Sequence, residues 1–381
     1  MNKFNFRFYA NIFFGSGVRY KINDIISDNN YKNICIVIDH ALLSVDLISE
    51  FIESINCNKI IVECDISEPT YDKLEDKRIF PEDSILDAFV GIGGGSALDM
   101  AKGLSVLYTN LDSAIKYRGF EKFNSNILPI IALPTTAGTG SEITPNASFI
   151  DLKEKKKMGI NGESIRPKFS ILDPELTLSC PIKPSISAGV DSLVHATEAF
   201  VAKKTNVMAQ MFAKQGFKLV IENLPKLKDD LNNILVRESI MYGAFLSAIA
   251  LMNSGTGPAA AMSYPLGVHY KVPHGIGGAI FLPHVIEYNI SKGFYSYTSL
   301  YRNNLFDSKN DIKNAASFID FIFNIWNQLN IPNEISIFGV YQKNIEEFVK
   351  DTMDLKLALD QNPITFYEDE IQMILNKLVI K

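Results

Sequence analysis

The feature that most constrains the fold of this sequence is a change of hydrophobic pattern near residue 184. Before this point, apolar runs of strand length alternate with amphipathic stretches, and the runs lie at 33–39, 59–64, 87–93 and 128–134. Alternating strands and helices indicate a parallel sheet covered on both faces. After this point the pattern has a helical period, in segments 187–204, 207–223, 236–253, 310–329 and 365–379. The sequence therefore predicts an α/β domain over 1–184 and an all-helical domain over 185–381.

Composition narrows the class of protein. A chain of 381 residues with 47% hydrophobic and 21% charged residues is ordinary globular material, and its length suits two domains or one large α/β unit. The net charge of −6 disfavours a nucleic-acid partner, and the lysine-rich run 153–157 is interpreted as a solvated loop. Because no apolar run approaches about 20 residues and no signal peptide is evident, we expect a soluble cytoplasmic protein without a membrane partner. The four cysteines lack CxxC spacing, which indicates buried thiols.

Two polar loops follow neighbouring predicted strands. The segment VGIGGGSALDMAK at 90–102 places three glycines between a strand and a helix, which suits an anion at a helix N-terminus. The segment LPTTAGTGSEITPN at 133–146 adds hydroxyl and backbone donors for phosphate and ribose oxygens. Asp39, at the end of the first strand, is placed to accept from an adenosine ribose and to repel a 2′-phosphate, which favours NAD over NADP. Plain turns and a turn-initiating Asp39 remain alternatives.

A polar stripe on one predicted helix is the second candidate site. Asp191, His195 and Glu198 lie at i, i+4 and i+7 within the apolar segment 187–202, so they share one helical face. A carboxylate and an imidazole one turn apart can bind the same divalent cation. A local Asp–His hydrogen bond is the alternative, and a third ligand from elsewhere would decide between the two.

Several motifs together resemble the iron-containing (group III) alcohol dehydrogenase family. They are GGGSALDMAK, PTTAGTGSEIT, ILDPELT, GVDSLVHATEAF and YPLGVHYKVPHGIGGAIFLPHV, and the match runs from FGSG at 14–17 to about residue 290. The resemblance implies an N-terminal α/β dinucleotide-binding domain, a helical C-terminal domain and an active site in the cleft between them. It also implies reversible hydride transfer between nicotinamide and an aldehyde or alcohol, helped by iron, zinc or another divalent metal.

The resemblance assigns residues to the cofactor by motif position. Asp39 falls on the adenosine ribose, Lys157 falls near the nicotinamide ribose, and Asn146 lies near the substrate. The remaining assignments place residues at the pyrophosphate turn or in the cofactor loop: Gly93, Gly94, Gly95, Ser96, Asp99, Thr135, Thr136, Thr139 and Ser141.

For the metal, the resemblance implies Asp191, His195 and His274 of the Pro-His-Gly turn as ligands. The family's remaining ligand histidine corresponds to Ala260, and a further histidine close to the reacting groups corresponds to Tyr264. Three outcomes are open. A metal stays on the three remaining ligands, His269 replaces the missing one, or the site holds no metal and Tyr264 or His274 donates to the substrate oxygen.

The resulting hypothesis is an NAD(P)-dependent oxidoreductase acting on a small polar aldehyde or primary alcohol. Tyr264, His274 and Asn146 are its candidate catalytic residues, and the family suggests a homodimer or larger assembly. Two alternatives are kept: a cyclising lyase of the dehydroquinate synthase type that uses NAD transiently, and a catalytically silent NAD-binding homologue. His40 is interpreted as a surface or cofactor-edge residue and His284 as a packed core residue.

Overall fold

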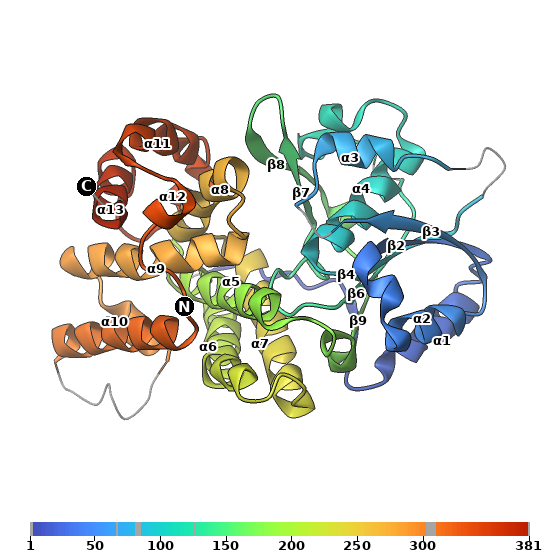
Figure 1. Cartoon of the computed structure of the whole chain (residues 1–381), viewed down its shortest axis with the longest axis horizontal. Coiled ribbons are helices and arrows are strands. Elements are labelled where there is room, and N and C mark those ends of the chain that lie inside the picture. The colour runs from blue at the N-terminus through green and yellow to red at the C-terminus, as the bar shows by residue number, and fades with distance from the viewer. Residues whose placement is uncertain (1–2, 66–67, 81–84, 125, 302–309, 380–381) are drawn as a thin grey trace. The chain divides into compact units, whose positions relative to one another are not determined.

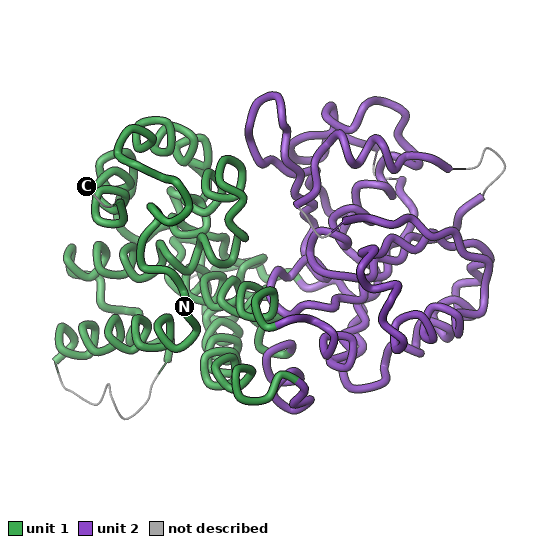
Figure 2. Tube along the Cα trace, viewed as in Figure 1, with its two compact units in different colours: residues 1–7, 182–231, 242–381 green, residues 8–181, 232–241 purple. Residues whose placement is uncertain are grey.

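The computed structural model describes residues 3–65, 68–80, 85–124, 126–301 and 310–379 (Figure 1). The chain divides into two units, drawn in different colours in Figure 2. The sheet unit contains residues 8–181 and 232–241, and the helical unit contains residues 1–7, 182–231 and 242–381. The division of the chain into domains at residue 184 stays a prediction.

The sheet unit is built on a six-stranded parallel sheet with the order β1-β9-β6-β4-β2-β3. Its strands are β1 (Asn11–Phe14), β2 (Asn33–Asp39), β3 (Asn58–Cys64), β4 (Ala88–Gly93), β6 (Ile130–Pro134) and β9 (Phe169–Leu172). The four strands expected from apolar runs are β2, β3, β4 and β6, so the predicted parallel sheet is confirmed. The edge strand β1 and the strand β9 have only four residues each, and their short apolar runs were not recognised.

Helices cover both faces of this sheet because alternate residues of its strands point to opposite sides. Ile34, Ile36 and Ile38 of β2 pack in one core with α1 (Lys21–Asp28) and α2 (Asp46–Glu53). Cys35 and Val37 of the same strand belong to the opposite core with α3 (Tyr71–Asp76) and α4 (Gly95–Thr109). Short 3₁₀ helices complete the connections: η1 (Val18–Tyr20), η2 (His40–Ser44), η3 (Ala114–Tyr117), η4 (Glu163–Ile165) and η5 (Pro174–Thr177).

A small second sheet in the same unit has the order β5-β8-β7. It comprises β5 (Gly119–Phe120), β7 (Asn146–Asp151) and β8 (Lys156–Asn161), and β7 pairs with β8 in antiparallel register. The lysine-rich run 153–157 was interpreted as a solvated loop, which is wrong for its last two residues because β8 begins at Lys156. The side chain of Lys157 is only 10% exposed.

The described part of the helical unit is made of helices, as the sequence predicted. Its α-helices are α5 (Ile182–Val201), α6 (Val207–Asn223), α7 (Ile234–Met252, which begins in the sheet unit), α8 (Pro258–Tyr270), α9 (His274–Ser291), α10 (Asp311–Gln328), α11 (Ile345–Met353), α12 (Lys356–Leu359) and α13 (Glu368–Leu378). Between them lie η6 (Leu224–Lys228), η7 (Ser296–Ser299), η9 (Ser336–Phe338) and η10 (Gln342–Asn344).

The helices α8 and α9 were not predicted, and each contains an internal proline, Pro265 and Pro283. Glycine and proline lower the local preference for helix, but small residues allow two helices to approach closely. A Cβ built on Gly277 of α9 would lie 2.9 Å from the Cβ of Ser263 of α8, so only glycine permits this approach. Tertiary packing therefore stabilises a helix pair that the local sequence disfavours.

The expectation that no apolar run approaches membrane-spanning length needs a correction at α7. This helix is long and apolar enough to cross a membrane by length and composition, although 67% of the relevant window is buried. A core helix of a folded domain passes the same test.

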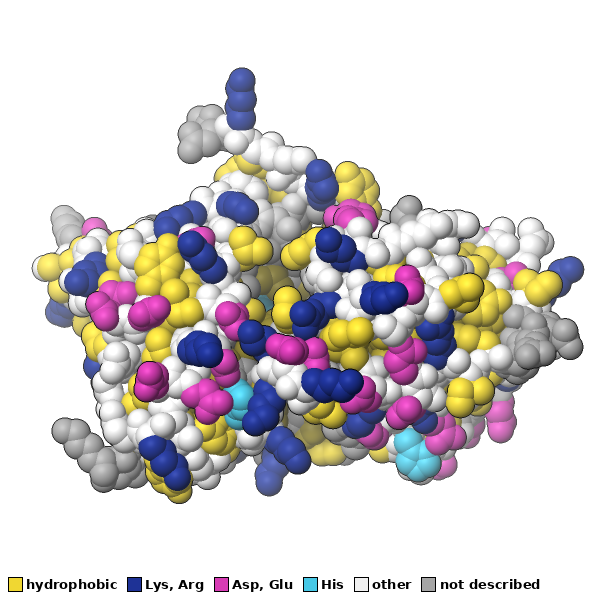
Figure 3. All heavy atoms as spheres, turned by 90° about the horizontal axis from the view of Figure 1, so that it is seen from above, with side chains coloured by type: hydrophobic (Ala, Val, Ile, Leu, Met, Phe, Trp, Pro, Cys, Tyr) yellow, Lys and Arg dark blue, Asp and Glu magenta, His cyan; other side chains and the backbone are white. Residues whose placement is uncertain are grey.

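On the face drawn in Figure 3, basic and acidic side chains are interspersed rather than separated by sign.

Candidate functional site

The glycine turn joins β4 to α4 in the sheet unit. Gly93 has φ of 150°, and a Cβ there would lie 2.6 Å from the Cβ of Ala97, so both backbone and space require glycine. Gly94 is the N-cap of α4, and Gly95 and Ser96 are its first residues. The turn therefore exposes the N-terminal backbone N–H groups of a 15-residue helix, which is a favourable place for a pyrophosphate.

The threonine-rich loop after β6 packs directly on this turn. The backbone N–H of Thr135 donates to the carbonyl of Gly93 at 2.9 Å. A Cβ on Gly95 would lie 2.9 Å from the Cγ2 of Thr139, while Thr136 lies beside Gly94. The two polar loops thus form one surface at the carboxyl edge of neighbouring strands, where open α/β sheets bind ligands. Thr139 is exposed, Thr136 is half-buried and Thr135 is buried.

Asp99 and Ser141 lie beneath this surface and bond to each other. The Ser141 hydroxyl donates to Asp99 Oδ1 at 2.5 Å, and Asp99 Oδ2 accepts from the backbone N–H of Ser148 at 2.8 Å. Lys102, which is fully buried, donates from Nζ to Ser141 Oγ at 2.8 Å, to the Thr144 carbonyl at 3.0 Å and to the Asn146 carbonyl at 2.7 Å. Burial lowers the pKa of Lys102 to about 8. These three side chains anchor the loop from within.

Asp39 lies at the end of β2, the strand next to β4. Its Oδ1 accepts from the backbone N–H of Ala41 at 3.0 Å as the cap of η2, and a Cβ on Gly93 would lie 3.6 Å from the Asp39 Cβ. Burial raises the pKa of this carboxyl above its usual range. Asp39 therefore caps η2, as the turn-initiating alternative predicted, and it also lies beside the glycine turn.

Asn146 and Lys157 lie on the small second sheet. Asn146 Nδ2 donates to Asn161 Oδ1 at 2.8 Å, so its amide is oriented by β8. Lys157 Nζ lies 3.0 Å from Glu68 Oε1, and the other carboxylate oxygen of Glu68 is buried and has no hydrogen-bond partner among the described residues. The Lys157 side chain is therefore largely buried and paired with a half-buried carboxylate, unlike the solvated side chains typical of a run of charges.

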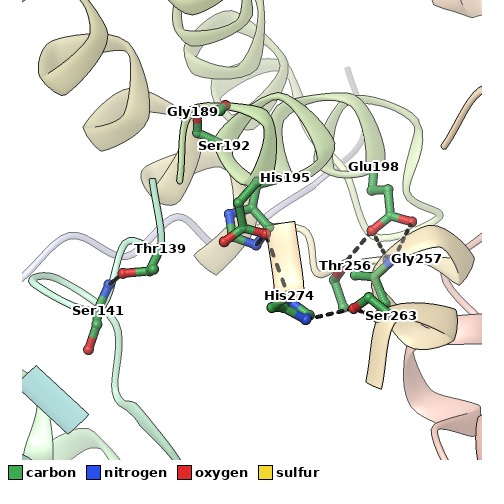
Figure 4. A network of polar contacts seen from close by, with 12 residues as sticks. Thr139, Ser141, Gly189, Ser192, His195, Glu198, Thr256, Gly257, Ser263 and His274 are labelled. Carbon is green, nitrogen blue, oxygen red and sulfur yellow. Dashed lines mark hydrogen bonds and ion pairs between the residues drawn. The ribbon is translucent and has the colours of Figure 1, made fainter. Parts of the chain in front are cut away.

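In the helical unit, Asp191, His195 and His274 converge on one point. One ligand atom from each lies within 4.8 Å of the others. Asp191 Oδ1 is 3.5 Å from His195 Nε2, one turn along α5, and 3.8 Å from His274 Nε2 at the start of α9. The two histidines are labelled in Figure 4. The third member expected from elsewhere in the chain thus comes from the Pro-His-Gly segment.

These spacings fit a divalent metal ion. Ligand atoms that each lie about 2.0–2.2 Å from a tetrahedrally coordinated ion are about 3.4 Å apart, close to the two separations measured from Asp191 Oδ1. They are too long for good hydrogen bonds between the same groups. One carboxylate and two imidazoles with coordination positions left open form a ligand set that suits iron(II) or catalytic zinc.

Glu198, the third residue of the polar stripe on α5, has a different task. Its carboxylate accepts from the Thr256 hydroxyl and from the backbone N–H of Gly257, each at 2.7 Å (Figure 4). It also accepts from the backbone N–H groups of Ala259 at 2.7 Å and of Ala260 at 3.3 Å. It therefore satisfies the otherwise unpaired N–H groups at the start of α8. This role explains why a buried carboxylate recurs on the face that carries Asp191 and His195.

The structure also places the residues that the resemblance relates to missing histidines. Ala260 is 3% exposed within α8. Tyr264, on the same helix, meets the ring of His274 edge to face with centroids 5.1 Å apart. His269 is not in the ligand group, because its Nε2 lies 2.7 Å from Asp351 Oδ2 on α11. This contact disfavours His269 as a replacement ligand.

The sequence analysis assigned no role to Lys102 or Ser263. For Lys102 the sequence offers one indication, because a lysine three residues after Asp99 interrupts a largely apolar helical segment. Ser263, whose Oγ lies 2.6 Å from His274 Nδ1, gave none because the contact joins two helices that were not predicted.

Comparison with known proteins gives matches over nearly the whole chain. Residues 10–174 match the sequence model of the family described as iron-containing alcohol dehydrogenase, and residues 185–379 match that of the C-terminal domain of the Fe-containing alcohol dehydrogenase family. The NAD-dependent methanol dehydrogenase of Bacillus methanolicus is 33% identical over 297 residues, which cover 77% of this chain and 77% of that protein.

Two further relatives extend the comparison. The sulfoacetaldehyde reductase of Bilophila wadsworthia is 30% identical over 293 residues, which cover 76% of each protein. The crystal structure of a 1,3-propanediol oxidoreductase is 26% identical and superposes with a TM-score of 0.91, covering 99% of this chain and 100% of that one.

Proposed function

Since this chain belongs to the iron-containing alcohol dehydrogenase family, we propose that it interconverts a small polar aldehyde and its primary alcohol with a nicotinamide cofactor. The family resemblance seen in the motifs is confirmed, and the enzyme is an alcohol dehydrogenase of this type. Family membership favours hydride transfer as the net reaction over a cyclising lyase or a silent homologue.

The convergence of Asp191, His195 and His274 carries the proposal. A cluster of one carboxylate and two imidazole nitrogens within 4.8 Å gives a place for a divalent ion, iron or zinc, in the unit that also contains Tyr264. When bound, such an ion supplies a Lewis acid that polarises a carbonyl oxygen. The three side chains would hold it and leave open positions, since Ala260 offers no ligand atom.

The sheet unit is proposed to bind the dinucleotide. The N–H groups at Gly94, Gly95 and Ser96 would face the pyrophosphate, and Thr136 and Thr139 would donate from the adjoining loop. Asp99, Ser141 and Lys102 hold that loop in place from beneath. The nicotinamide ring supplies or accepts the hydride.

We assign NAD rather than NADP as the cofactor. The carboxylate of Asp39 at the end of β2 would accept from the adenosine ribose hydroxyls and would repel a 2′-phosphate. Lys157 is assigned to the nicotinamide ribose, with Glu68 orienting its ammonium group.

Tyr264 is proposed to deliver the proton to the substrate oxygen. Its ring packs edge to face on that of His274, so the phenol is carried beside the ligand cluster. A water held by His274 is the second possible donor. Asn146, with its amide oriented by Asn161, is assigned to a polar group of the substrate.

Two further proposals concern the cellular compartment and the oligomeric state. Free thiols at Cys35, Cys64 and Cys180, all buried, suit a reducing cytoplasm. A homodimer or larger assembly is proposed on the family resemblance.

The test is an assay of the purified chain with NADH and a panel of short aldehydes, including hydroxylated and acidic ones, together with elemental analysis. We expect NADH oxidation with at least one polar aldehyde and stoichiometric iron or zinc. Bound NADH without turnover of any carbonyl by protein loaded with either metal would overturn the proposal. Turnover by protein that contains no metal would support the oxidoreductase activity and reject the proposed metal site.

A further inference from the structure

We propose that Ser263 is a positioning residue that fixes His274 in the tautomer protonated on Nδ1. This tautomer leaves the lone pair of Nε2 facing Asp191 and His195. Nothing in the family resemblance assigned Ser263 to the site. The inference rests on the proposed metal site for its functional consequence, but the tautomer is a property of the protein without metal.

Two hydrogen bonds at one hydroxyl carry the argument. Ser263 Oγ lies 2.6 Å from the Ala260 carbonyl oxygen and 2.6 Å from His274 Nδ1. Figure 4 shows the contact between Ser263 and His274. A carbonyl oxygen can only accept, so the single proton of the hydroxyl must point toward Ala260. The ring nitrogen must then be the donor in the second bond, which places the imidazole proton on Nδ1.

Packing holds this arrangement in place. Ser263 is fully buried, and Gly277 of α9 approaches it so closely that a Cβ there would lie 2.9 Å from the Ser263 Cβ. On its other side, the start of α9 presses on α5, where a Cβ on Gly275 would lie 2.0 Å from the Ser187 carbonyl oxygen. The His274 backbone and the Ser263 hydroxyl are thus fixed relative to each other by two close helix contacts.

The orientation of Nε2 follows from the same bond. Nε2 of His274 lies 3.8 Å from Asp191 Oδ1, and in the tautomer protonated on Nδ1 this nitrogen carries no proton, as a metal ligand requires. A hydrogen bond to the second ring nitrogen is the usual way in which proteins orient a ligating histidine. His195 differs, because its buried Nδ1 has no hydrogen-bond partner within the part of the chain that the structure describes. Of the two ligand histidines, His274 is therefore the one whose tautomer is set by the protein.

A nucleophilic role for Ser263 is excluded by the same observations. The order Ser263, His274 and Asp191 superficially resembles a Ser-His-Asp triad. However, the Ser263 side chain is fully buried, and its proton points to a backbone carbonyl rather than to the imidazole. A buried hydroxyl of this kind orients its neighbour and attacks no substrate.

The first experiment needs no variant. The full chain labelled with ¹⁵N-histidine contains five imidazoles, and the metal-free protein is measured at about pH 8.5, where an unperturbed histidine is neutral. Long-range ¹H–¹⁵N spectra distinguish the two neutral tautomers, and a His274→Gln variant identifies the signal. We expect His274 to be protonated on Nδ1. Protonation on Nε2 would overturn the proposal whatever the behaviour of any mutant.

The second experiment compares Ser263→Ala with Ser247→Ala. Ser247 is also fully buried in the helical unit, but its hydroxyl donates to a backbone carbonyl, that of Gly243 at 2.9 Å, in the same helix α7. The affinity for zinc(II) is measured by competition with a chelator. We expect the Ser263 variant to lose the Nδ1-H tautomer and to bind zinc about 10- to 100-fold more weakly, while the Ser247 variant matches wild type.

The outcomes separate this inference from the proposed function. Unchanged tautomer and zinc affinity in a folded Ser263→Ala protein would overturn the positioning role. A variant that loses the tautomer while neither it nor wild type binds iron or zinc would support the positioning role and reject the metal site. If Ser263→Ala does not fold, the tautomer of His274 in the wild-type protein still tests the proposal.

Discussion

The carboxylate of Glu198 accepts a 2.7 Å hydrogen bond from the backbone N–H of Gly257, the N-cap of α8. A Cβ on Gly257 would lie 2.8 Å from Glu198 Oε1, so the glycine allows the carboxylate to reach the helix end. The residue that shares a face with Asp191 and His195 therefore anchors the helix that carries Tyr264. One stripe of α5 therefore carries two of the proposed metal ligands and also supports a neighbouring helix.

Replacement of Glu198 by Ala is expected to destabilise the protein by about 3 kcal/mol, because buried N–H groups at the start of α8 lose a charged acceptor. The measurement is denaturant unfolding, with metal content determined in parallel. Glu222→Ala is the control, since Glu222 is exposed in the same unit and accepts a hydrogen bond from the Tyr301 hydroxyl at 3.0 Å. If both variants lose the same free energy of unfolding relative to wild type, the hydrogen bonds of Glu198 contribute no more to stability than an ordinary exposed hydrogen bond.

Replacement of Lys102 by Met is expected to cost about 3–5 kcal/mol of stability and to weaken NADH binding. The variant leaves half-buried Asp99 without its neighbouring ammonium group and removes the Lys102 donor from the Thr144 and Asn146 carbonyls. Lys116→Met is the matched control, because the Lys116–Asp112 ion pair is exposed and should contribute less than about 1 kcal/mol. If the Lys102→Met protein binds NADH as tightly as wild type does, Lys102 has no role in supporting the cofactor-binding loop.

The parts of this structure that the sequence predicted are those in which local pattern and tertiary position agree. The strands β2, β4 and β6 are buried on both faces, so each reads as a continuous apolar run. The pair Asp191 and His195 could be recognised as candidate ligands because they lie one turn apart on a single helix.

Other parts depended on contacts between distant segments. Helices α8 and α9 have a sequence rich in alanine, glycine and proline, and their stability comes from packing on each other. His274 could be joined to Asp191 only through the family resemblance, since they are far apart in the chain. Ser263 acts on a ring presented by another helix, and no spacing in the sequence indicates such a contact.

Replacement of Asp39 by Asn is expected to raise the preference for NADPH relative to NADH by about 10-fold, because the charge that repels a 2′-phosphate is removed. The ratio of kcat/KM for the two cofactors measures this effect. Asp46→Asn, an exposed aspartate in the first turn of α2, is the control. No change in cofactor preference would contradict the role assigned to Asp39.

The same carboxyl gives an expected pH dependence. Burial raises the pKa of Asp39, so on acidification it takes up its proton at a higher pH than an ordinary aspartate. Discrimination against NADPH in wild type should therefore be present above the raised pKa and weaken as pH falls through it. The Asp39→Asn protein should lack this dependence, and a parallel decline in both proteins would assign it to another group.

Replacement of His195 by Ala is expected to abolish stoichiometric metal binding, since two ligands remain and one coordination partner of Asp191 is lost. His269→Ala is the matched control, because that imidazole is bonded to Asp351 outside the cluster and should be dispensable for metal. Elemental analysis of both proteins after identical loading is the measurement. Loss of metal in the His269 variant instead would revive its role as a replacement ligand.

Tyr264→Phe tests the proton donor while preserving the edge-to-face packing on His274. Removing only the hydroxyl should lower kcat for aldehyde reduction by about 10²- to 10⁴-fold, the range typical of a positioned general acid, and should leave the affinity for NADH unchanged. Tyr270→Phe, on the same helix, is the control. A rate limited by proton delivery should also show a solvent isotope effect that the variant alters. If Tyr264→Phe turns over at the wild-type rate across the pH range, the proton comes instead from water held by His274.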